Sequence, residues 1–401
     1  MRWQIGDMLG ELTSSGDEGA AEIAKAAMDL APADPRSSWI LGAVLRSEFT
    51  PEATDLSVIQ MQNSVRLAPY QSRWWSELGR SQEQAGDYEK AEAAFKRAVD
   101  LAPEYTLPNW QLGNFYLRRS RVGEAVAPLK KAAEHSSLYR GQVFSIAWSY
   151  FGNDPQMVEQ FSSGQAAVRA GLVSFYANLN RPDDALRVWN SLSEEEKTQF
   201  TNIAKDAAKK LFAQHSFAAA IELSRQAGID KYSRPGAFTN GDFESGLKER
   251  DQHIFDWSVR RTDNKAEIST DTTVTHGGKR SLRINFRTYS NPDFYAFDQV
   301  VGVHPATKQK IEFWVRTENL KSGSMPLIVV LSASDDKFLA ASPAFTSGTN
   351  DWQMMSIDVD VPENTDGIRV RTAREGCGTE CPISGLFWLD DFTITEIGQR
   401  K

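Results

Sequence analysis

Three copies of one six-residue pattern occur in the N-terminal part of the chain. The segments are Ala27–Pro32, Ser64–Pro69 and Ala98–Pro103, and each of them ends in Leu-Ala-Pro. The last two copies are 34 residues apart, and the residues around them recur with the same period. A fixed period in this range is typical of stacked helical repeats, in which each unit packs only against its neighbours. The pattern therefore predicts a long binding surface rather than a buried catalytic pocket.

The repeat unit is most complete between Ser72 and Pro103. It places a bulky residue and Leu-Gly in a first predicted helix, then Ala, Phe, Ala and Pro at fixed offsets in a second helix. The residues that carry the pattern are Trp75, Leu78, Gly79, Gly86, Asp87, Tyr88, Ala91, Phe95, Ala98 and Pro103. This pattern resembles the tetratricopeptide repeat, a helical hairpin that stacks on further hairpins. Gly79 and Ala91 are small where the two helices cross closely, and Pro103 ends the second helix.

The resemblance covers about residues 1–215 and weakens away from this central unit. Further units are expected over residues 1–32, 39–69 and 106–137, from about residue 140 and from about residue 166, with a helical cap over residues 193–227. Apolar residues recur at helical spacing throughout this region. The predicted fold of residues 1–230 is therefore an α-solenoid of helical hairpins.

The chain changes character near residue 230. From there on, β-branched and aromatic residues alternate with polar ones, and Gly, Asn, Asp and Pro separate short runs. Such alternation is typical of half-buried antiparallel strands. The clearest runs are Ile311–Thr317, Pro326–Leu331, Gln353–Val361 and Gly367–Thr372. About nine to eleven strands with turns between them predict a sandwich or jelly roll over residues 236–398.

Five short segments of this second region follow one another in an order that resembles another family. They are Asn240–Glu244, Trp257, Gly278–Leu282, Phe313–Arg316 and Trp388–Phe392. Their order is similar to that of the galactose-binding-like jelly rolls, in particular the carbohydrate-binding modules of families four and nine. The two resemblances together imply a multidomain protein, with an α-solenoid followed by an antiparallel β-sandwich jelly roll.

The resemblance to the second family also implies a structural calcium ion where the first and last strands meet. In similar domains the opening Glu and the closing Asp bind the ion, which makes Glu244 and Asp390 the expected ligands here. The loop Gly278–Ser281 is the expected source of backbone carbonyls, because calcium needs several oxygen ligands. The alternative is that both acidic residues lie at turns and strand ends without a metal.

Sugar binding would need an aromatic face with polar side chains beside it. The candidates are Tyr289, Asn291, Asp293, Phe294, Tyr295 and Trp352. All but the last belong to one loop, for which the alternative is the hydrophobic start of a strand. We expect Trp257, Trp314 and Trp388 in the core instead.

Protein binding is expected on the first helix of each hairpin. In tetratricopeptide proteins the second, fifth, ninth and twelfth positions of this helix usually face a groove. In this chain they include Arg73, Arg80, Trp110, Asn114, Phe144, Trp148 and Phe151. Arginine can clamp a carboxylate and exposed aromatic rings give apolar contacts, which suits an extended peptide or protein segment. The alternative is that the aromatic residues belong to the core.

Composition and motifs exclude several classes of function. The net charge of −8, without any run of Lys and Arg, argues against nucleic acid or an anionic membrane as a partner. No apolar stretch is long enough to span a membrane. The five His residues are scattered, and no phosphate loop, Gly-x-Ser-x-Gly motif or His-Glu-x-x-His motif occurs, so we expect no enzyme.

The chain has two cysteines, Cys377 and Cys381. Two ligands are too few for a zinc site, which needs four. The close spacing favours a disulfide that closes a small loop, which would indicate an oxidising compartment. The alternative is a pair of free thiols.

These features predict a non-catalytic adaptor, in which the solenoid binds a protein and the jelly roll binds a glycan. The combination suggests the periplasmic or extracellular side of a bacterial cell envelope and a role in polysaccharide assembly or export. One alternative is a protein-only scaffold whose jelly roll binds no sugar, and another is the accessory part of a membrane enzyme of glycan synthesis. Because helical spacing begins at the first residues, we also expect that a signal or anchor was removed from a longer product.

Overall fold

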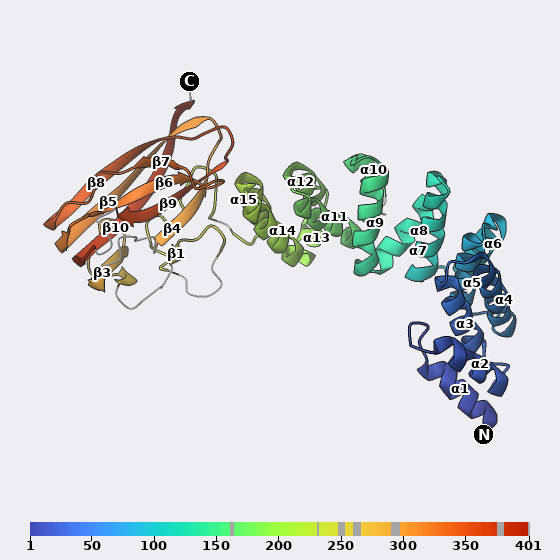
Figure 1. Cartoon of the computed structure of the whole chain (residues 1–401). Coiled ribbons are helices and arrows are strands. Elements are labelled where there is room, and N and C mark those ends of the chain that lie inside the picture. The colour runs from blue at the N-terminus through green and yellow to red at the C-terminus, as the bar shows by residue number, and fades with distance from the viewer. Residues whose placement is uncertain are drawn as a thin grey trace. The chain divides into compact units, whose positions relative to one another are not determined.

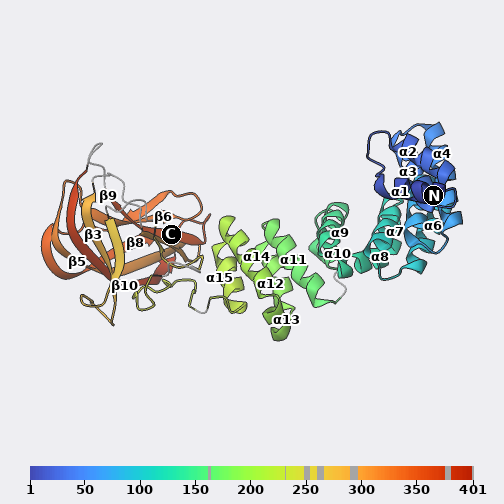
Figure 2. The same cartoon turned by 90° about the horizontal axis from the view of Figure 1, so that it is seen from below.

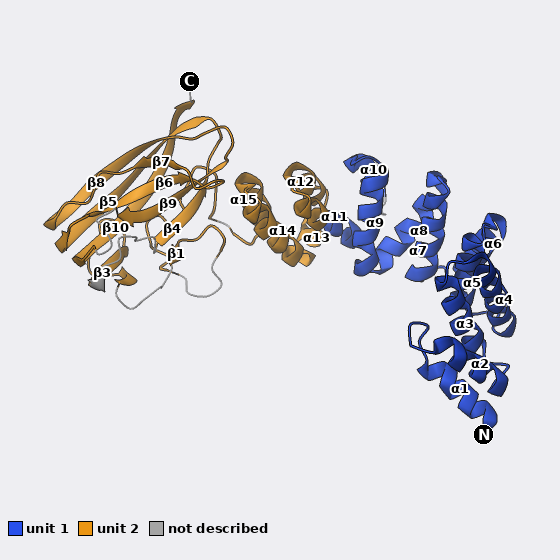
Figure 3. Cartoon of the chain, in the orientation of Figure 1, with its two compact units in different colours: residues 1–172 blue, residues 173–401 orange. Residues whose placement is uncertain are grey.

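The computed structural model of the chain describes residues 1–160, 164–230, 232–247, 253–259, 266–289, 297–374 and 381–399. The chain divides into two compact units, Met1–Leu172 and Val173–Lys401 (Figure 3). Helices form the first unit and the beginning of the second, and strands follow (Figure 1). The predicted class, an α-solenoid followed by an antiparallel β-sandwich, is thereby confirmed.

The first unit consists of helical hairpins. Its helices are α1 (Arg2–Leu12), α2 (Ala20–Leu30), α3 (Pro35–Ser47), α4 (Pro51–Leu67), α5 (Ser72–Gln84), α6 (Tyr88–Leu101), α7 (Thr106–Arg118), α8 (Val122–His135), α9 (Ser137–Tyr150), α10 (Pro155–Glu159) and the first part of α11 (Ala166–Asn178). The helices pack in the pairs α3–α4, α5–α6 and α7–α8, and adjacent pairs touch through α4–α5 and α6–α7. The first helix α5 also touches the first helices on either side of it, α3 and α7. They form a continuous layer that we call the first-helix face.

Glycine lets the two helices of a hairpin approach closely. A Cβ atom on Gly79 of α5 would lie 2.9 Å from the ring of Phe95 on α6. One on Gly113 of α7 would lie 2.5 Å from Cγ of Leu129 on α8. Phe95 and Leu129 are both buried, so the recurring Leu-Gly of the sequence marks the places where the helices cross.

The second unit contains the remaining helices and the strands. The helices are the end of α11, α12 (Pro182–Asn190), α13 (Glu194–Gln199), α14 (Thr201–Ala213) and α15 (Phe217–Gln226). The strands are β1 (Ser258–Val259), β2 (Ala266–Asp271), β3 (Ser281–Tyr289), β4 (Phe297–Gly302), β5 (Thr307–Ser322), β6 (Pro326–Ser332), β7 (Phe338–Ala341), β8 (Gly348–Asp360), β9 (Gly367–Arg374) and β10 (Ile383–Gln399). They form sheet A, in the order β1-β4-β9-β6-β7, and sheet B, in the order β2-β3-β10-β5-β8. Neighbouring strands are antiparallel, and one core of apolar side chains fills the space between the sheets.

Helix α15 packs directly against sheet A. In both Figure 1 and Figure 2 it is the helix nearest to the strands. A Cβ atom on Gly367 of β9 would lie 2.5 Å from the ring of Phe217, and one on Gly302 of β4 would lie 2.4 Å from Ile221. The carboxylate of Asp366 accepts the first two backbone N–H groups of α15, at 3.2 and 2.8 Å. The last helix and the sandwich therefore pack as one body within this unit.

Replacing Asp366 by alanine is expected to lower the free energy of unfolding by about 1 kcal/mol, because α15 loses its N-terminal cap. Thermal unfolding of the full chain, followed by circular dichroism, measures the change. The matched control is Asp360→Ala, since the side chain of Asp360 is 59% exposed on β8 and its Lys308 partner is 3.6 Å away. Equal losses of stability in the two variants would contradict the capping role.

Candidate binding sites

A hollow of about 630 Å³ opens on the first-helix face of the first unit. It is lined by Ala43, Arg46, Ser47, Phe49, Arg80, Glu83, Gln84 and Arg118. These residues come from the last turns of α3, α5 and α7 and from the turn that follows α3. Because the three helices lie side by side, arginines from three successive hairpins meet at one place.

Two carboxylates hold the arginines of the hollow. Arg46 and Arg80 both contact Glu77, at 2.7 and 3.1 Å. Burial opposes the charge of Glu77, but the two guanidinium groups together outweigh it and hold the pKa of Glu77 below its usual range. Arg118 makes two hydrogen bonds of 2.7 Å to the carboxylate of Glu83. The side chains of Arg80 and Arg118 stay 48% and 53% exposed, so both can still meet a ligand.

The predicted groove residues of α5 and α7 lie on or near the first-helix face. Arg73 is exposed, and its guanidinium carbon lies 4.3 Å from the ring centre of Trp39 on α3. Trp110 is half-buried, with its ring centre 5.3 Å from that of Tyr139. The side-chain amide of Asn114 donates to the carbonyl oxygen of Trp110 at 2.8 Å, which orients the amide along its own helix. A partner could therefore reach the stacked Arg73 and part of the Trp110 ring.

The predicted groove residues of α9 and of the turn that follows it are less accessible. Phe144 is 1% exposed, so its ring belongs to the helix packing and is closed to a partner, contrary to the prediction. The physical reason is that this position of α9 faces the neighbouring helices instead of the open side. Trp148 and Phe151 are partly exposed.

Arg46, Glu83 and Arg118 line the hollow but were not among the predicted groove residues. Glu83 takes the same position in its repeat as Phe151, so the period alone could have identified it. Arg46 takes this same position, four residues after Gly42 as Glu83 is four residues after Gly79, whereas Arg118 lies one residue beyond it in α7. Only the stacking of the hairpins brings them together.

Glu244 and Asp390, the predicted calcium ligands, hold the same loop between β2 and β3. The Oε1 atom of Glu244 accepts the backbone N–H groups of Lys279 and Arg280, at 2.6 and 2.8 Å. Asp390 is fully buried, and its Oδ2 atom accepts the backbone N–H of His276 at 2.9 Å. The opening segment and the last strand of the sandwich thus meet at one loop.

The chemistry of this loop suits a cation in part. Burial raises the pKa of Asp390 to about 6, and the neighbouring carboxylate of Asp391 adds to the shift, so a positive charge there would be stabilising. Calcium takes about six to eight oxygen ligands. Within the described ranges, however, no group of three or more His, Cys, Asp or Glu side chains is placed to hold a metal. Glu244 and Asp390 would need backbone carbonyls and water to complete the site.

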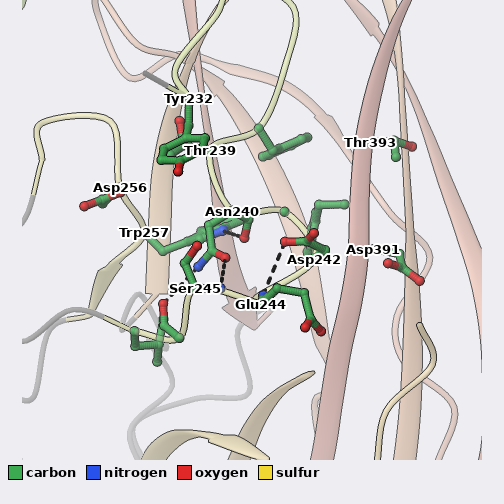
Figure 4. A pocket seen from close by; sticks show the side chains of 15 residues that line it. Tyr232, Thr239, Asn240, Asp242, Glu244, Ser245, Asp256, Trp257, Asp391 and Thr393 are labelled. Atoms are coloured by element: carbon green, nitrogen blue, oxygen red, sulfur yellow. Dashed lines mark hydrogen bonds between the residues drawn. The ribbon is translucent and has the colours of Figure 1, made fainter. Parts of the chain in front are cut away.

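A pocket of about 580 Å³ lies beside Glu244. Figure 4 shows the carboxylates of Asp242, Glu244 and Asp391 on one side of this pocket and that of Asp256 on the other. Its apolar lining includes the buried ring of Trp257. Such a lining suits a small polar ligand that carries hydroxyl or amino groups.

Trp352 lies on β8, on the outer face of sheet B. The ring centre of His276 lies 5.6 Å from that of Trp352 and 3.8 Å from that of Trp314. Trp314 alternates along β5 with the core residues Phe313 and Val315, so it points outward and is partly exposed. The prediction that Trp314 belongs to the core is therefore wrong.

The loop predicted to bind sugar lies outside the described residues. It contains Asn291, Asp293, Phe294 and Tyr295, and the side chain of Tyr289 is not described either. Trp257 is 3% exposed and belongs to the core of the sandwich, as predicted. Trp388 is also 3% exposed, but it alternates along β10 with the core residues Phe387 and Leu389, so it is buried on the outer face of sheet B and the prediction that it belongs to the core is wrong.

Of the two cysteines, Cys377 also lies outside the described residues. Cys381 is fully buried, and its sulfur accepts a hydrogen bond of 2.7 Å from Nη2 of Arg374. The disulfide between the two cysteines stays a prediction. None of the helices in the described part of the chain has the length and apolarity that a membrane crossing requires.

Comparison with known families identifies one repeat directly. The model of the tetratricopeptide repeat matches residues 72–105, which contain α5 and α6. No curated protein matches the chain. This match identifies residues 72–105 as a tetratricopeptide repeat, and the two antiparallel sheets of the second unit form the predicted sandwich.

Several solved structures are similar to parts of the chain. A CBM4 structure is 15% identical, with a TM-score of 0.30, over 40% of this chain and 99% of that one. A Family 16 Carbohydrate Binding Module-2 is 18% identical, with a TM-score of 0.27, over 40% of this chain and 99% of that one. MamA 41-end from Desulfovibrio magneticus RS-1 is 25% identical, with a TM-score of 0.28, over 33% of this chain and 73% of that one. The fold itself follows from the helices and strand pairing described above.

Proposed function

We propose that this chain is a non-catalytic adaptor. Its first-helix face binds an acidic protein segment, and its jelly roll binds a glycan. A protein that holds both would serve polysaccharide assembly or export, on the periplasmic or extracellular side of a bacterial cell envelope. The observation that carries the proposal is the hollow in which Arg46, Arg80 and Arg118 meet.

The contacts inside the hollow indicate the chemistry of its ligand. Each of the three arginines already contacts a carboxylate of the chain, either Glu77 or Glu83. A guanidinium group has five N–H donors in a planar fork, so it can hold a second carboxylate beside the first. Three guanidinium groups face two carboxylates, which leaves a positive charge for an acidic ligand. The hollow therefore suits aspartate, glutamate or the free carboxylate of a peptide.

An apolar ring stands beside these charges. Phe49 also lines the hollow, and its side chain is 80% exposed. Its φ angle of 57° lies in the left-handed region, which residues other than glycine rarely adopt. A peptide with an apolar residue next to its acidic group would cover this ring and gain from the burial.

Charge reversal in the hollow tests the protein-binding half of the proposal. The double variant Arg80→Glu, Arg118→Glu is expected to weaken binding of acidic peptides by more than tenfold, because each lost pair of this kind is worth about 1.5–3 kcal/mol. Fluorescence anisotropy with a library of labelled peptides rich in Glu and Phe measures the affinity. Raising the salt concentration should weaken the wild-type complex as well.

The matched control is Arg97→Glu. Arg97 is exposed on α6, a second helix, so it carries the same charge change away from the first-helix face. The proposal requires that Arg97→Glu binds like the wild type. It fails if the library contains no binder, or if the control loses as much affinity as the double variant.

Glycan binding by the jelly roll has support from two features of the second unit. The outer face of sheet B carries aromatic rings, and the pocket beside Glu244 combines carboxylates with an aromatic lining. Sugar rings stack on aromatic side chains, and their hydroxyl groups bond to polar side chains nearby. Screening the full chain on a glycan array tests this half, and a chain that binds no glycan would contradict it.

We also propose a structural calcium ion at Glu244 and Asp390. Calcium at a hundredfold excess over its dissociation constant is expected to stabilise the chain by about 2.7 kcal/mol, which raises the melting temperature by about 5–10 °C. Glu244→Gln and Asp390→Asn should remove this shift. Asp358→Asn, at an exposed position of β8, should keep it. A melting temperature that does not change between calcium and a chelator would refute the site.

A further inference from the structure

The outer face of sheet B carries a row of tryptophans on neighbouring strands. Trp314 is on β5, Trp352 on β8 and Trp388 on β10. In the strand register, Trp314 pairs with Met354 and Asp390 on the adjacent strands. Since cross-strand partners point to the same side of a sheet, these side chains share the face that is turned away from the core.

The loop between β2 and β3 adds a fourth ring to this face. The ring of His276 is stacked on that of Trp314, with centres 3.8 Å apart and planes 17° apart. It meets the ring of Trp352 edge-on, at 5.6 Å and 66°. The three rings form a wall that we call the His-Trp wall, defined by His276, Trp314 and Trp352.

The position of His276 is fixed from two sides. Its backbone N–H donates to the buried Asp390, and its Nδ1 atom lies 2.7 Å from Oδ2 of Asp391. The stack on Trp314 gives the ring a third contact. A ring held in this way loses little conformational freedom when a ligand covers it. The wall is thus preorganised for binding.

Polar groups with unused hydrogen-bonding capacity surround the wall. Among the described residues, none accepts a hydrogen bond from the indole N–H of Trp314 or Trp352, whereas that of Trp388 donates to Asp271 at 3.0 Å. Arg316 is the next outward residue of β5. Its Nη1 atom lies 3.3 Å from Oδ1 of Asp351, whose side chain is 86% exposed. Free indole donors, a guanidinium group and a carboxylate therefore stand within reach of whatever covers the rings.

We infer that the His-Trp wall, with Arg316 and Asp351, is the site at which this chain binds a pyranose unit of a glycan. The C–H face of the sugar would lie against the rings, and its hydroxyl groups would bond to the indole N–H groups and to the charged pair. A protein hot spot needs a desolvated apolar centre. Here charged groups flank the rings directly, which favours a hydroxylated ligand. The inference depends on the proposed glycan binding and names its site.

The test uses the full chain and the polysaccharide that the wild type binds best on a glycan array. Titration calorimetry in calcium-containing buffer compares the wild type with Trp352→Ala, His276→Ala and His276→Phe. Both alanine variants are expected to lose about tenfold in affinity. His276→Phe should keep most of it, because the ring that stacks on Trp314 is retained.

The matched control is Phe338→Ala. Phe338 is 65% exposed on β7 of sheet A, so an aromatic ring is removed from the opposite sheet of the same sandwich. Unchanged affinity in this control, with lower affinity in the two alanine variants, supports the site. Wild-type affinity in Trp352→Ala, or a larger loss in Phe338→Ala, would overturn the inference and leave glycan binding in place. A wild-type chain that binds nothing on the array would instead refute the proposed function.

Discussion

Replacing Phe217 by alanine is expected to lower the free energy of unfolding of the second unit by about 3–5 kcal/mol. The Phe217 ring is 1% exposed and lies against Gly367, where even a Cβ atom would come within 2.5 Å. It also meets the ring of Phe212 edge-on at 5.2 Å, and Phe212 meets Phe255 in the same way. The alanine variant would leave a cavity between α15 and sheet A that the rigid strands cannot fill.

Urea unfolding of the full chain, followed by tryptophan fluorescence, measures this effect. The control Phe338→Ala makes the same change at a ring that is 65% exposed in the same unit, and it should cost less than about 0.5 kcal/mol. If Phe217→Ala is no more destabilising than this control, α15 does not depend on the sandwich for its stability. If the large loss is observed, the packing of Phe217 against Gly367 contributes strongly to holding α15 on the jelly roll, beside the cap by Asp366 and the contact between Ile221 and Gly302.

The repeats could be predicted from the sequence because their packing is local. Gly79 lies in α5 and Phe95 in the next helix, so both residues of the crossing fall within one repeat of fixed length. The alternation of side chains along a strand is equally local. It would have been enough to place Trp314 on the outer face of the sheet. Phe313 and Val315 face the core, hence the residue between them faces outward. The error arose because tryptophan was assigned to the core by residue type instead of by its place in the strand.

The attachment of α15 could not be predicted, because it joins residues that are far apart in the sequence. Asp366 and Gly367 have the appearance of an ordinary turn before a strand, yet they cap α15 and make room for Phe217. Nothing near Phe217 in the sequence indicates this partner. The hollow of the first unit has a similar origin, since Arg46 and Arg118 meet only when the hairpins stack. Contacts of this kind need the folded chain.

Replacing Leu129 by alanine is expected to destabilise the first unit by about 2–5 kcal/mol. Leu129 is 1% exposed, and its Cγ and Cδ2 atoms occupy the space that a Cβ atom on Gly113 would need, at 2.5 and 2.7 Å. Gly113→Ala alone is expected to cost about 1–3 kcal/mol through overpacking, offset by up to about 1 kcal/mol from the higher helix propensity of alanine. In the double variant, the new methyl group enters the cavity that the leucine leaves.

The double variant should therefore lose less free energy of unfolding than the two single variants lose together, and the difference, the coupling energy, is expected to be about 0.5–3 kcal/mol. Urea unfolding of the wild type and the three variants gives this coupling, and strict additivity would show that α7 and α8 do not cross at this pair.

The same crossing sets the position of α7, which brings Arg118 to the hollow. A Leu129→Ala chain that is still folded should thus bind acidic peptides more weakly, and Gly113→Ala should recover part of that affinity in the double variant. If affinity is lost in Leu129→Ala and partly recovered in the double variant, the packing at Gly113 controls the position of Arg118 in the hollow.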